Sequence, residues 1–244
     1  YMKIGIVLVT YNRMNDLKKA LSKYESQIKK PEYILVVNNN SSDGTREMLK
    51  EWKMINCGIT KYVINLDRNI GGSGGFYTGL QKSLSLECDW IWVADDDAYP
   101  YEDALENAEI FLEKRVELDN ISAICGTVIN NGKIDTSHRR RITNNKFKVI
   151  EKEVMESEYE KDYFELNLFS YVGSIINKKI LKDVGITEKE YFIYCDDTEH
   201  SYRLSKVGKI FCVPTIKISH DVELQNREEI NWKRYYGIRN KLLF

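Results

Sequence analysis

Three consecutive carboxylates, Asp95, Asp96 and Asp97, directly follow an apolar run that contains two tryptophans. Like charges at this spacing raise one another's pKa unless a cation or hydrogen-bond donors compensate. Mg²⁺ takes oxygen ligands, commonly one or two carboxylates together with phosphates, and Mn²⁺ accepts the same carboxylates with an imidazole beside them. The cluster therefore favours a metal–phosphate site. The alternative is a solvated turn that caps the next helix.

A second acidic group contains Asp196, Asp197 and Glu199. Asp196 and Glu199 have the spacing of a capping box, which is a sufficient structural explanation for that pair. Asp197 then lies in the first turn of the expected helix, where the helix dipole favours an ionised carboxylate. An ionised carboxylate at the edge of a substrate site is suited to general-base catalysis, which makes Asp197 the candidate base. Arg203, four residues after Glu199, is expected to be its ion-pair partner on the helix.

Two further clusters follow other apolar runs. Gly71–Gly75 exposes backbone N–H groups before an expected helix, which suits a diphosphate or a sugar, although a tight packing turn explains it equally well. It is neither a dinucleotide-binding fingerprint nor a P-loop, because it follows the third apolar run and lacks Gly-Lys-Ser/Thr. Asn38–Asp43 holds more polar side chains than one helix cap requires. It is open to two interpretations, a cap or a set of amides that reads a nucleobase.

The histidines carry weaker signals. His220 follows an expected short strand, and on the residues alone a lone histidine is more often structural than a metal ligand. His138–Arg141 is most simply a solvated loop, with a face for an anionic acceptor or a membrane as the alternative.

The length, charge balance and cysteine content of the chain exclude several classes of protein. Its 244 residues make one large or two small domains, and 36 basic against 37 acidic residues leave no electrostatic argument for nucleic acid. No apolar run approaches the ~18 residues of a membrane-spanning helix. Five scattered cysteines without a CxxC motif argue against a zinc knuckle or a disulfide framework and favour a reducing cytosol. A helical pattern still runs at Phe244, which indicates a C-terminal truncation.

Apolar runs alternate with helical patterns through the first part of the chain. The expected strands are Ile4–Val9, Tyr33–Val37, Tyr62–Leu66 and Trp90–Ala94. A βαβαβαβ order predicts an α/β fold with a mostly parallel, doubly wound (Rossmann-like) sheet, helices on both faces and polar loops gathered at its carboxyl edge.

The rest of the chain is expected to extend the same domain, residues 1–244. Residues 130–165 lose the pattern and are read as a variable insertion or hairpin. The remaining expected elements are a helix from Pro100 to Lys114, a strand at Ile121–Gly126, an ordered stretch at Leu168–Asn177, helices at Lys178–Val184 and from Asp197 to Gly208, strands at Ile210–Val213 and Ile216–Ser219, and a helix over Glu228–Phe244.

Together these motifs resemble family 2 inverting glycosyltransferases of the GT-A fold, and within that family most of all the bacterial galactofuranosyltransferases, followed by rhamnosyltransferases. The resemblance spans nearly the whole chain, with its motifs in order and at the family's spacing. The matching stretches are Thr10–Arg13, Val36–Thr45, Asn69–Phe76, Asp95–Asp97, Tyr191–Asp197 and Tyr235–Asn240.

The resemblance implies roles for individual residues, with Mn²⁺ or Mg²⁺ as the cofactor. It places Asp197 at the position of the catalytic base and Asn39 beside the nucleobase. The family often has Asp where this chain has Asn38 and Asn39, which leaves the identity of the base open. The implied metal ligands are Asp95, Asp97 and His220. The implied donor-binding residues are Thr10, Tyr11, Arg13, Asn39, Asn69, Gly72, Asp95 and Asp96. The residues expected at the acceptor are Ser170, Tyr171 and Asp196, because the aromatic face of the Phe169–Gly173 segment can stack on a sugar.

The implied reaction moves galactofuranose from UDP-galactofuranose, or rhamnose from dTDP-rhamnose, to a cell-surface glycan or lipid-linked acceptor. The expected location is the cytoplasm, at the inner face of the membrane. One alternative is a sugar-1-phosphate nucleotidyltransferase, which would need a glycine-rich basic loop where Thr10–Arg13 has no glycine. The other is a sugar-nucleotide-binding module without turnover, against which the intact Asp95–Asp97 and Asp197 argue.

Overall fold

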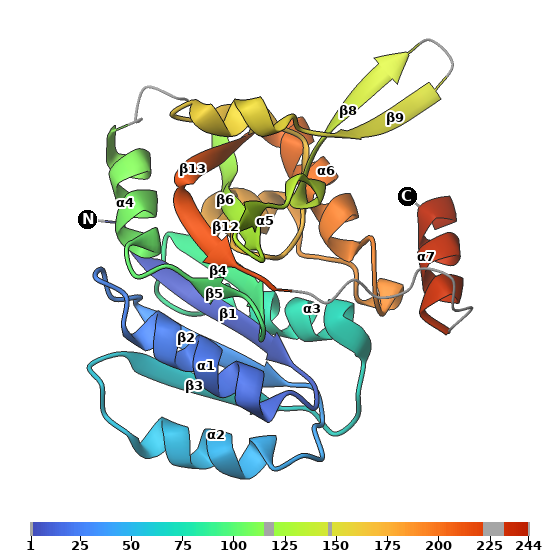
Figure 1. Cartoon of the computed structure of the whole chain (residues 1–244). Helices are drawn as coiled ribbons and strands as arrows, with labels where there is room; N and C mark the ends of the chain where they lie inside the picture. The colour runs from blue at the N-terminus through green and yellow to red at the C-terminus, as the bar shows by residue number, and fades with distance from the viewer. Residues whose placement is uncertain (1, 115–119, 146–147, 222–231, 244) are drawn as a thin grey trace.

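The computed structural model describes residues 2–114, 120–145, 148–221 and 232–243 (Figure 1). Its first part forms the predicted βαβαβαβ arrangement, with parallel strands in the order β4-β1-β2-β3. These elements are β1 (Ile4–Thr10), α1 (Met14–Glu25), β2 (Tyr33–Asn38), α2 (Thr45–Met54), β3 (Thr60–Asn65), α3 (Gly71–Ser83) and β4 (Trp90–Asp95).

The sheet continues beyond β4 in the order β12-β6-β13-β10. β12 is antiparallel to both of its neighbours, whereas β6 and β13 are parallel to each other. The mostly parallel sheet is therefore confirmed. The elements of this half are β5 (Tyr99–Pro100), α4 (Ala104–Lys114), β6 (Ile121–Asn130), β7 (Lys133–Ile134), β10 (Phe164–Leu166), β12 (Ser174–Asn177), α5 (Lys178–Val184), α6 (Asp196–Val207) and β13 (Lys209–Ser219).

Helices cover both faces of the sheet because the central strands are apolar on both sides. Along β1, Ile6 and Leu8 belong to one hydrophobic cluster with α1, α2 and α4. Val7 and Val9 belong to a second cluster with α3, α5 and α6. Successive side chains of a strand point to opposite faces, so a continuous apolar run buries both.

The described residues within 130–165, namely 130–145 and 148–165, form regular parts of the fold. β8 (Arg139–Asn145) and β9 (Lys148–Glu153) form a hairpin that projects from the body of the molecule (Figure 1). β11 (Leu168–Phe169) pairs with β8 and completes a small three-stranded sheet. The helix α7 (Trp232–Leu243) lies at one side, and the short 3₁₀ segments are η1 (Thr136–His138), η2 (Glu156–Glu160) and η3 (Lys189–Tyr191).

Two expected boundaries are wrong, and a third lies outside the described residues. Pro100 lies in β5, where it is paired with Ile218 of β13, and the helix begins only at Ala104. The two short strands expected after Gly208 are one strand, β13, whose register with β6 shifts around Pro214 because proline has no N–H for the ladder. The C-terminal helix begins at Trp232 in the described part of the chain, and residues 228–231 lie outside it.

Candidate functional site

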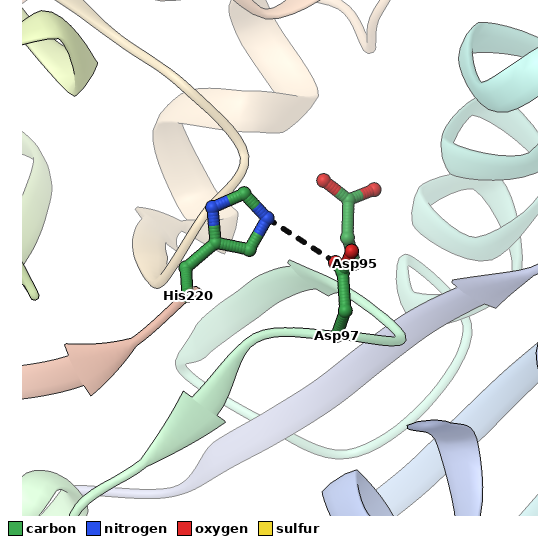
Figure 2. A group of neighbouring side chains, drawn as sticks. All are labelled: Asp95, Asp97 and His220. Carbon is green, nitrogen blue, oxygen red and sulfur yellow. Dashed lines mark ion pairs between the residues drawn. The ribbon is translucent and has the colours of Figure 1, made fainter. Parts of the chain in front are cut away.

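Asp95, Asp97 and His220 meet at the carboxyl edge of the sheet (Figure 2). One ligand atom from each lies within 4.8 Å of the others. Asp95 ends β4, and the two-residue strand β5 follows Asp97 and pairs with the end of β13, with Tyr99 opposite Ser219. This pairing places the loop after β4 beside His220, whose N–H also donates to the carbonyl of Ile129.

The three side chains offer ligand atoms of the kind that a divalent cation requires. Nε2 of His220 lies 3.2 Å from Oδ1 of Asp97. Burial raises the pKa of Asp97, but His220 and Arg13 outweigh it and lower the pKa to about 2. Oδ1 of Asp97 and Nδ1 of His220 are buried, and neither makes a hydrogen bond of good geometry within the described chain. Two carboxylates and one imidazole suit Mn²⁺, so the residues present fit a metal.

The pKa values of the Asp95 and Asp96 carboxyls are both raised. Burial, followed by the charge of Asp97, raises the pKa of Asp95 to about 7. Burial likewise raises the pKa of Asp96 to about 7. Arg13, in the loop after β1, places a positive charge beside these carboxyls. Its Nη1 lies 3.5 Å from Oδ1 of Asp96 and forms an ion pair with Asp97. Arg13 thus joins two loops of the edge where Thr10 is buried and Tyr11 is exposed.

Asn39 holds the start of α3. Its Nδ2 donates to the carbonyl of Gly71 at 2.8 Å, and its Oδ1 accepts from the N–H of Ile70 at 2.9 Å. Asn38 donates in the same way to Oδ1 of Asn65 at 2.8 Å. Both ends of the Asn39 amide are therefore engaged within the protein, and a contact of Asn39 with a nucleobase stays a prediction.

The other polar residues of the Asn38–Asp43 cluster connect two loops. Oγ of Ser41 accepts from the N–H of Asn12 at 2.9 Å, and Oδ2 of Asp43 accepts from the N–H of Met14 at 2.9 Å. Oδ1 of Asp43 accepts from the N–H of Thr45 at the start of α2. Most of the surplus polar side chains thus satisfy backbone donors between the β1–α1 and β2–α2 loops, which is a third explanation beside capping and base reading.

The glycine cluster lies inside the first turns of α3, and its members differ. Gly71 has φ +78°, and a Cβ there would lie 2.1 Å from the carbonyl oxygen of Phe192. A Cβ on Gly75 would lie 2.4 Å from Val9. At Gly72, by contrast, a Cβ would meet nothing within 4 Å. Close packing therefore explains Gly71 and Gly75, and Gly72 is the open position. The N–H of Gly71 is already taken by Oδ1 of Asn69 at 2.8 Å.

Asp197 lies in the first turn of α6, but the capping box is wrong. Cys195 precedes the helix with φ 68° and makes no side-chain cap, so α6 begins at Asp196 itself. Glu199 pairs instead with Arg203 at 2.6 Å, which confirms the expected ion pair along the helix. Oδ1 of Asp197 accepts from the N–H of Thr198 at 2.6 Å.

Burial opposes the helix dipole at the two neighbouring carboxyls of α6, Asp196 and Asp197. Burial and the charge of Asp197 raise the pKa of Asp196 well above its usual range. Burial also raises the pKa of Asp197, and the cationic Arg140 is the main opposing influence. The charge of Asp197 also helps to raise the pKa of Asp95, so the two acidic groups influence each other electrostatically.

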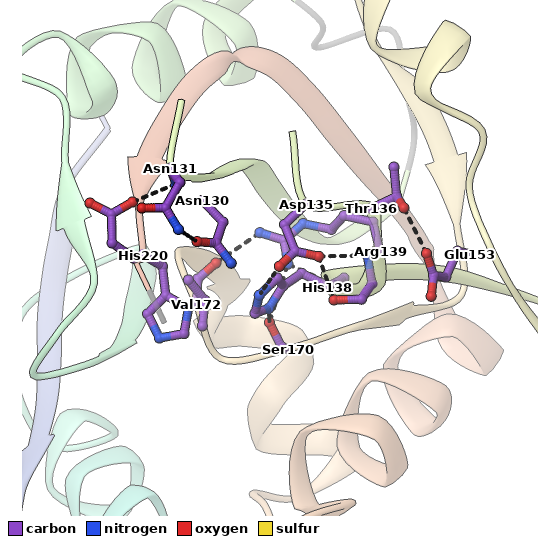
Figure 3. Close-up of polar contacts among 12 residues, drawn as sticks. Asn130, Asn131, Asp135, Thr136, His138, Arg139, Glu153, Ser170, Val172 and His220 are labelled. Atoms are coloured by element: carbon purple, nitrogen blue, oxygen red, sulfur yellow. Dashed lines mark hydrogen bonds and ion pairs between the residues drawn. The ribbon is translucent and has the colours of Figure 1, made fainter. Parts of the chain in front are cut away.

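The interpretation of His138–Arg141 as a solvated loop is wrong (Figure 3). Arg139 is fully buried and donates to the carbonyls of Gly126 at 2.9 Å and Val172 at 2.8 Å. Nδ1 of His138 lies 2.6 Å from Oγ of Ser170, and its ring centroid lies 5.4 Å from that of His220. Sequence reasoning missed these residues because three adjacent arginines carry no signal of burial.

Tyr171 lies inside the core. Its ring centroid is 4.6 Å from that of Phe76, and its hydroxyl is 2.5 Å from Nδ1 of the buried His200. The ring therefore offers no open face, and the stacking role expected for it does not fit this arrangement. Ser170, next to it, does reach the site through His138.

Helix α7 clamps the segment that leads into Asp196 and Asp197. Nδ2 of the buried Asn240 donates to the carbonyls of Tyr191, Ile193 and Tyr194 at 2.8–2.9 Å. Arg239 donates to the carbonyl of Tyr191 as well. These bonds satisfy a segment that includes three residues with positive φ, namely Phe192, Tyr194 and Cys195.

Among the described residues, no helix is both long and apolar enough to cross a membrane. Relatives with curated names resemble the chain at modest identity. Galactofuranosyltransferase GlfT1 of Mycolicibacterium smegmatis is 25% identical over 84% of this chain and 66% of its own length. dTDP-rhamnosyl transferase RfbF of Shigella flexneri is 25% identical over 98% of this chain and 79% of its own. The chain thus spans slightly less than two thirds of the galactofuranosyltransferase.

The solved structures agree on the fold. GalNAc-T7, crystallised with UDP, GalNAc and Mn²⁺, superposes with a TM-score of 0.74 at 15% identity, over 94% of this chain and 45% of its own. At that identity the likeness concerns the fold, and it confirms the GT-A architecture expected from the motif order. Residues 5–185 match the Glycosyl transferase family 2 domain, which is most of the chain. The protein belongs to glycosyltransferase family 2.

Proposed function

We propose that this chain is the catalytic domain of a metal-dependent, inverting glycosyltransferase that uses a nucleotide-diphosphate sugar. The observation that carries the proposal is the convergence of Asp95, Asp97 and His220 within 4.8 Å. The charge of Asp197 also contributes to the raised pKa of Asp95. Asp95, Asp97 and His220 would hold Mn²⁺ or Mg²⁺. When bound, such a cation acts as a Lewis acid that neutralises charge on a departing diphosphate.

Asp197 is the proposed base. Its carboxylate accepts the proton of the acceptor hydroxyl while the hydroxyl oxygen bonds to the anomeric carbon of the donor sugar. The bond from that carbon to the diphosphate breaks at the same time, and its electron pair leaves with the diphosphate. One displacement on the face opposite the leaving group inverts the configuration. No covalent nucleophile is required.

UDP-galactofuranose is the proposed donor, with dTDP-rhamnose as the second candidate. The support is the activity after which the two relatives are named, together with the motif Asn69–Phe76. Purified protein incubated with a panel of nucleotide sugars and Mn²⁺ should release UDP from UDP-galactofuranose, and chelation of the metal should stop the release. In competition binding, a clear preference for dTDP over UDP would reverse the order of the two donors. Release that is insensitive to the chelator would exclude metal dependence.

The proposed acceptor is a glycan or a lipid-linked sugar, reached by peripheral association with the membrane. Helix α7 supports this, because within Trp232–Leu243 every charged side chain is cationic. A cationic helix with exposed aromatic and aliphatic residues suits an anionic membrane surface. Its most exposed apolar residues are Trp232, Tyr235, Ile238, Leu242 and Leu243.

Vesicles test this association directly. The protein should co-sediment with phosphatidylglycerol vesicles and remain in the supernatant with phosphatidylcholine vesicles. Leu242→Ser should weaken the co-sedimentation, whereas Met54→Ser, an exposed apolar residue on α2, should not. Equal binding of the Leu242 variant would exclude α7 as the contact.

A further inference from the structure

Arg140 connects the β8–β9 hairpin with the helix that carries Asp197. Its Nη2 donates to Oγ1 of Thr198 at 2.8 Å, and its Nη1 donates to Oε2 of Glu151 at 2.5 Å. The hydroxyl of Thr198 in turn donates to Oδ1 of Asp197 at 3.1 Å, the oxygen that also accepts from the Thr198 N–H. A chain of hydrogen bonds thus runs from a guanidinium in the hairpin to the carboxylate of the candidate base.

The backbone holds this guanidinium in place. β8 is the middle strand of its small sheet, so Arg140 is paired with Glu153 of β9 on one side and Leu168 of β11 on the other. The side chain of Arg140 is 23% exposed, and Thr198 is 5% exposed. Charge interactions that are partly buried are screened far less by salt than those in open solvent. The contact is therefore ordered and mostly out of water.

The charge of Arg140 favours the ionised form of Asp197, which burial disfavours. Burial raises the pKa of Asp197, and Arg140 is the main influence in the opposite direction. A hydrogen bond to the ionised form favours that form, and so does an opposite charge close by. The other ionisable groups whose charge is linked to Asp197 are acidic or neutral: Asp196 and Cys195 before it in the chain, Asp95 at the end of β4, and Tyr171 between β11 and β12.

We propose that Arg140 is the positioning residue of the catalytic base: through the hydroxyl of Thr198 it orients the Asp197 carboxylate and keeps it ionised. The inference rests on the proposed role of Asp197. It makes the hairpin a working part of the site, within the stretch 130–165 that was expected to be a variable insertion or hairpin. Glu151 engages the other nitrogen of the same guanidinium, so both strands of the hairpin set the position of the positive charge.

Arg140→Gln tests the proposal, and Arg141→Gln is its matched control. Arg141 is the next residue of the same strand and makes a comparable ion pair, with Nη2 2.9 Å from Oε2 of Glu158, but it has no contact with α6 among those described. The assay is Mn²⁺-dependent release of UDP from UDP-galactofuranose, with water as the acceptor, followed as a function of pH. Binding of UDP with Mn²⁺ and thermal unfolding are measured on each variant.

The loss of the Arg140 guanidinium in Arg140→Gln should raise the pKa of Asp197. An opposite charge lowers a carboxyl pKa by roughly 1–3 units, so the acidic limb of the rate profile in Arg140→Gln should move to higher pH by about one unit or more. Turnover should fall by about tenfold on that limb and recover in part at higher pH, with UDP–Mn²⁺ binding unchanged. Arg141→Gln should keep the wild-type profile. Arg140→Lys keeps the positive charge but lacks the two guanidinium nitrogens. It should return the acidic limb of the rate profile to its wild-type pH.

Thr198→Val removes the hydroxyl and keeps the shape of the side chain. If the relay exists, its effect should not add to that of Arg140→Gln, because both changes break the same chain of bonds. A wild-type acidic limb in Arg140→Gln, together with an inactive Asp197→Asn, would overturn the inference and leave the proposed function intact. An active Asp197→Asn would overturn the proposed function itself. A lower melting temperature with an unmoved pH limb would reduce Arg140 to a structural role.

Discussion

Nε2 of His220 lies 3.2 Å from Oδ1 of Asp97, although one residue follows the last strand of the sheet and the other follows β4. The pairing of β5 with β13 makes this contact possible, because it places Tyr99, two residues after Asp97, opposite Ser219, which precedes His220. Asp97 and His220 would both be ligands of a divalent cation, together with Asp95.

The first prediction concerns the metal. His220→Ala and Asp97→Ala should each weaken Mn²⁺-dependent binding of UDP by at least about tenfold, since outer-shell partners of a metal site alone are worth 10–100-fold. Glu51→Gln is the control, because Glu51 is an exposed carboxylate on α2 and lies outside the ligand cluster. Calorimetry with UDP in the presence and absence of Mn²⁺ measures the effect. Unchanged metal dependence in His220→Ala would exclude His220 from the ligands.

The second prediction separates Asp197 from Asp196. Asp197→Asn should lower transfer by about 10²–10⁴-fold, the usual span of general-base catalysis, and leave UDP–Mn²⁺ binding intact. Burial raises the pKa of Asp196 well above its usual range and so favours the neutral carboxyl, which the uncharged amide of Asp196→Asn resembles. That variant should keep the wild-type melting temperature. The base is assigned to the wrong carboxyl if Asp197→Asn turns over normally and Asp196→Asn is inactive.

The third prediction compares two adjacent glycines. Gly71→Ala should cost more than about 1 kcal/mol of stability, because a positive φ is strained for alanine and the Cβ would strike Phe192. Gly72→Ala should keep or slightly raise stability, because nothing lies within 4 Å of the new Cβ. If a diphosphate lies against this turn, Gly72→Ala should still bind UDP more weakly. Wild-type affinity in that variant would remove Gly72 from the donor site.

The fourth prediction concerns pH. Burial lowers the pKa of His200 to about 3, below the value of about 6.5 in an unfolded chain. Between these values the unfolded chain binds a proton that the folded chain does not, so stability falls as the pH falls below 6.5. The slope due to His200 is about 1.4 kcal/mol per pH unit.

Urea unfolding at several pH values measures this slope. His200→Gln should be less stable than the wild type at neutral pH, because it disturbs the contacts with Tyr171 and Gly185. Its stability should nevertheless depend less steeply on pH below 6.5. Parallel curves for the two proteins would show that His200 does not remain neutral in the fold.

The fifth prediction concerns the clamp by α7. Asn240→Ala removes the Nδ2 donor to the carbonyls of Ile193 and Tyr194 and one of the donors to the carbonyl of Tyr191, at a cost of about 1–3 kcal/mol. Turnover should fall as well, because the same segment leads into Asp197. Arg234→Ala, on an exposed position of the same helix, is the control. An Asn240 variant with normal stability and turnover would show that α7 does not order this segment.

The elements of the sheet were predictable because their signals are local. The apolar runs of β1, β2 and β4 and the helical spacing of Leu17, Ala20 and Leu21 are visible within short windows. Errors arose where a distant partner decided the structure. Pro100 has the sequence of a helix start, yet it pairs with Ile218 in β13. Asp196 has the spacing of a cap, yet Cys195 turns the chain one residue earlier.

By itself the sequence determined which side chains are available and at which strand ends they stand, because strand and helix periodicity depend on neighbours in the chain. It therefore pointed to Asp95, Asp97, Asp197 and, through the family resemblance, His220. Only the tertiary structure decided which polar groups are already hydrogen-bonded within the protein, such as Asn39. It also decided which groups are connected by hydrogen bonds across the fold, such as Arg140 with Asp197 through the hydroxyl of Thr198. Hydrogen bonding and desolvation depend on contacts between distant segments, which no local pattern records.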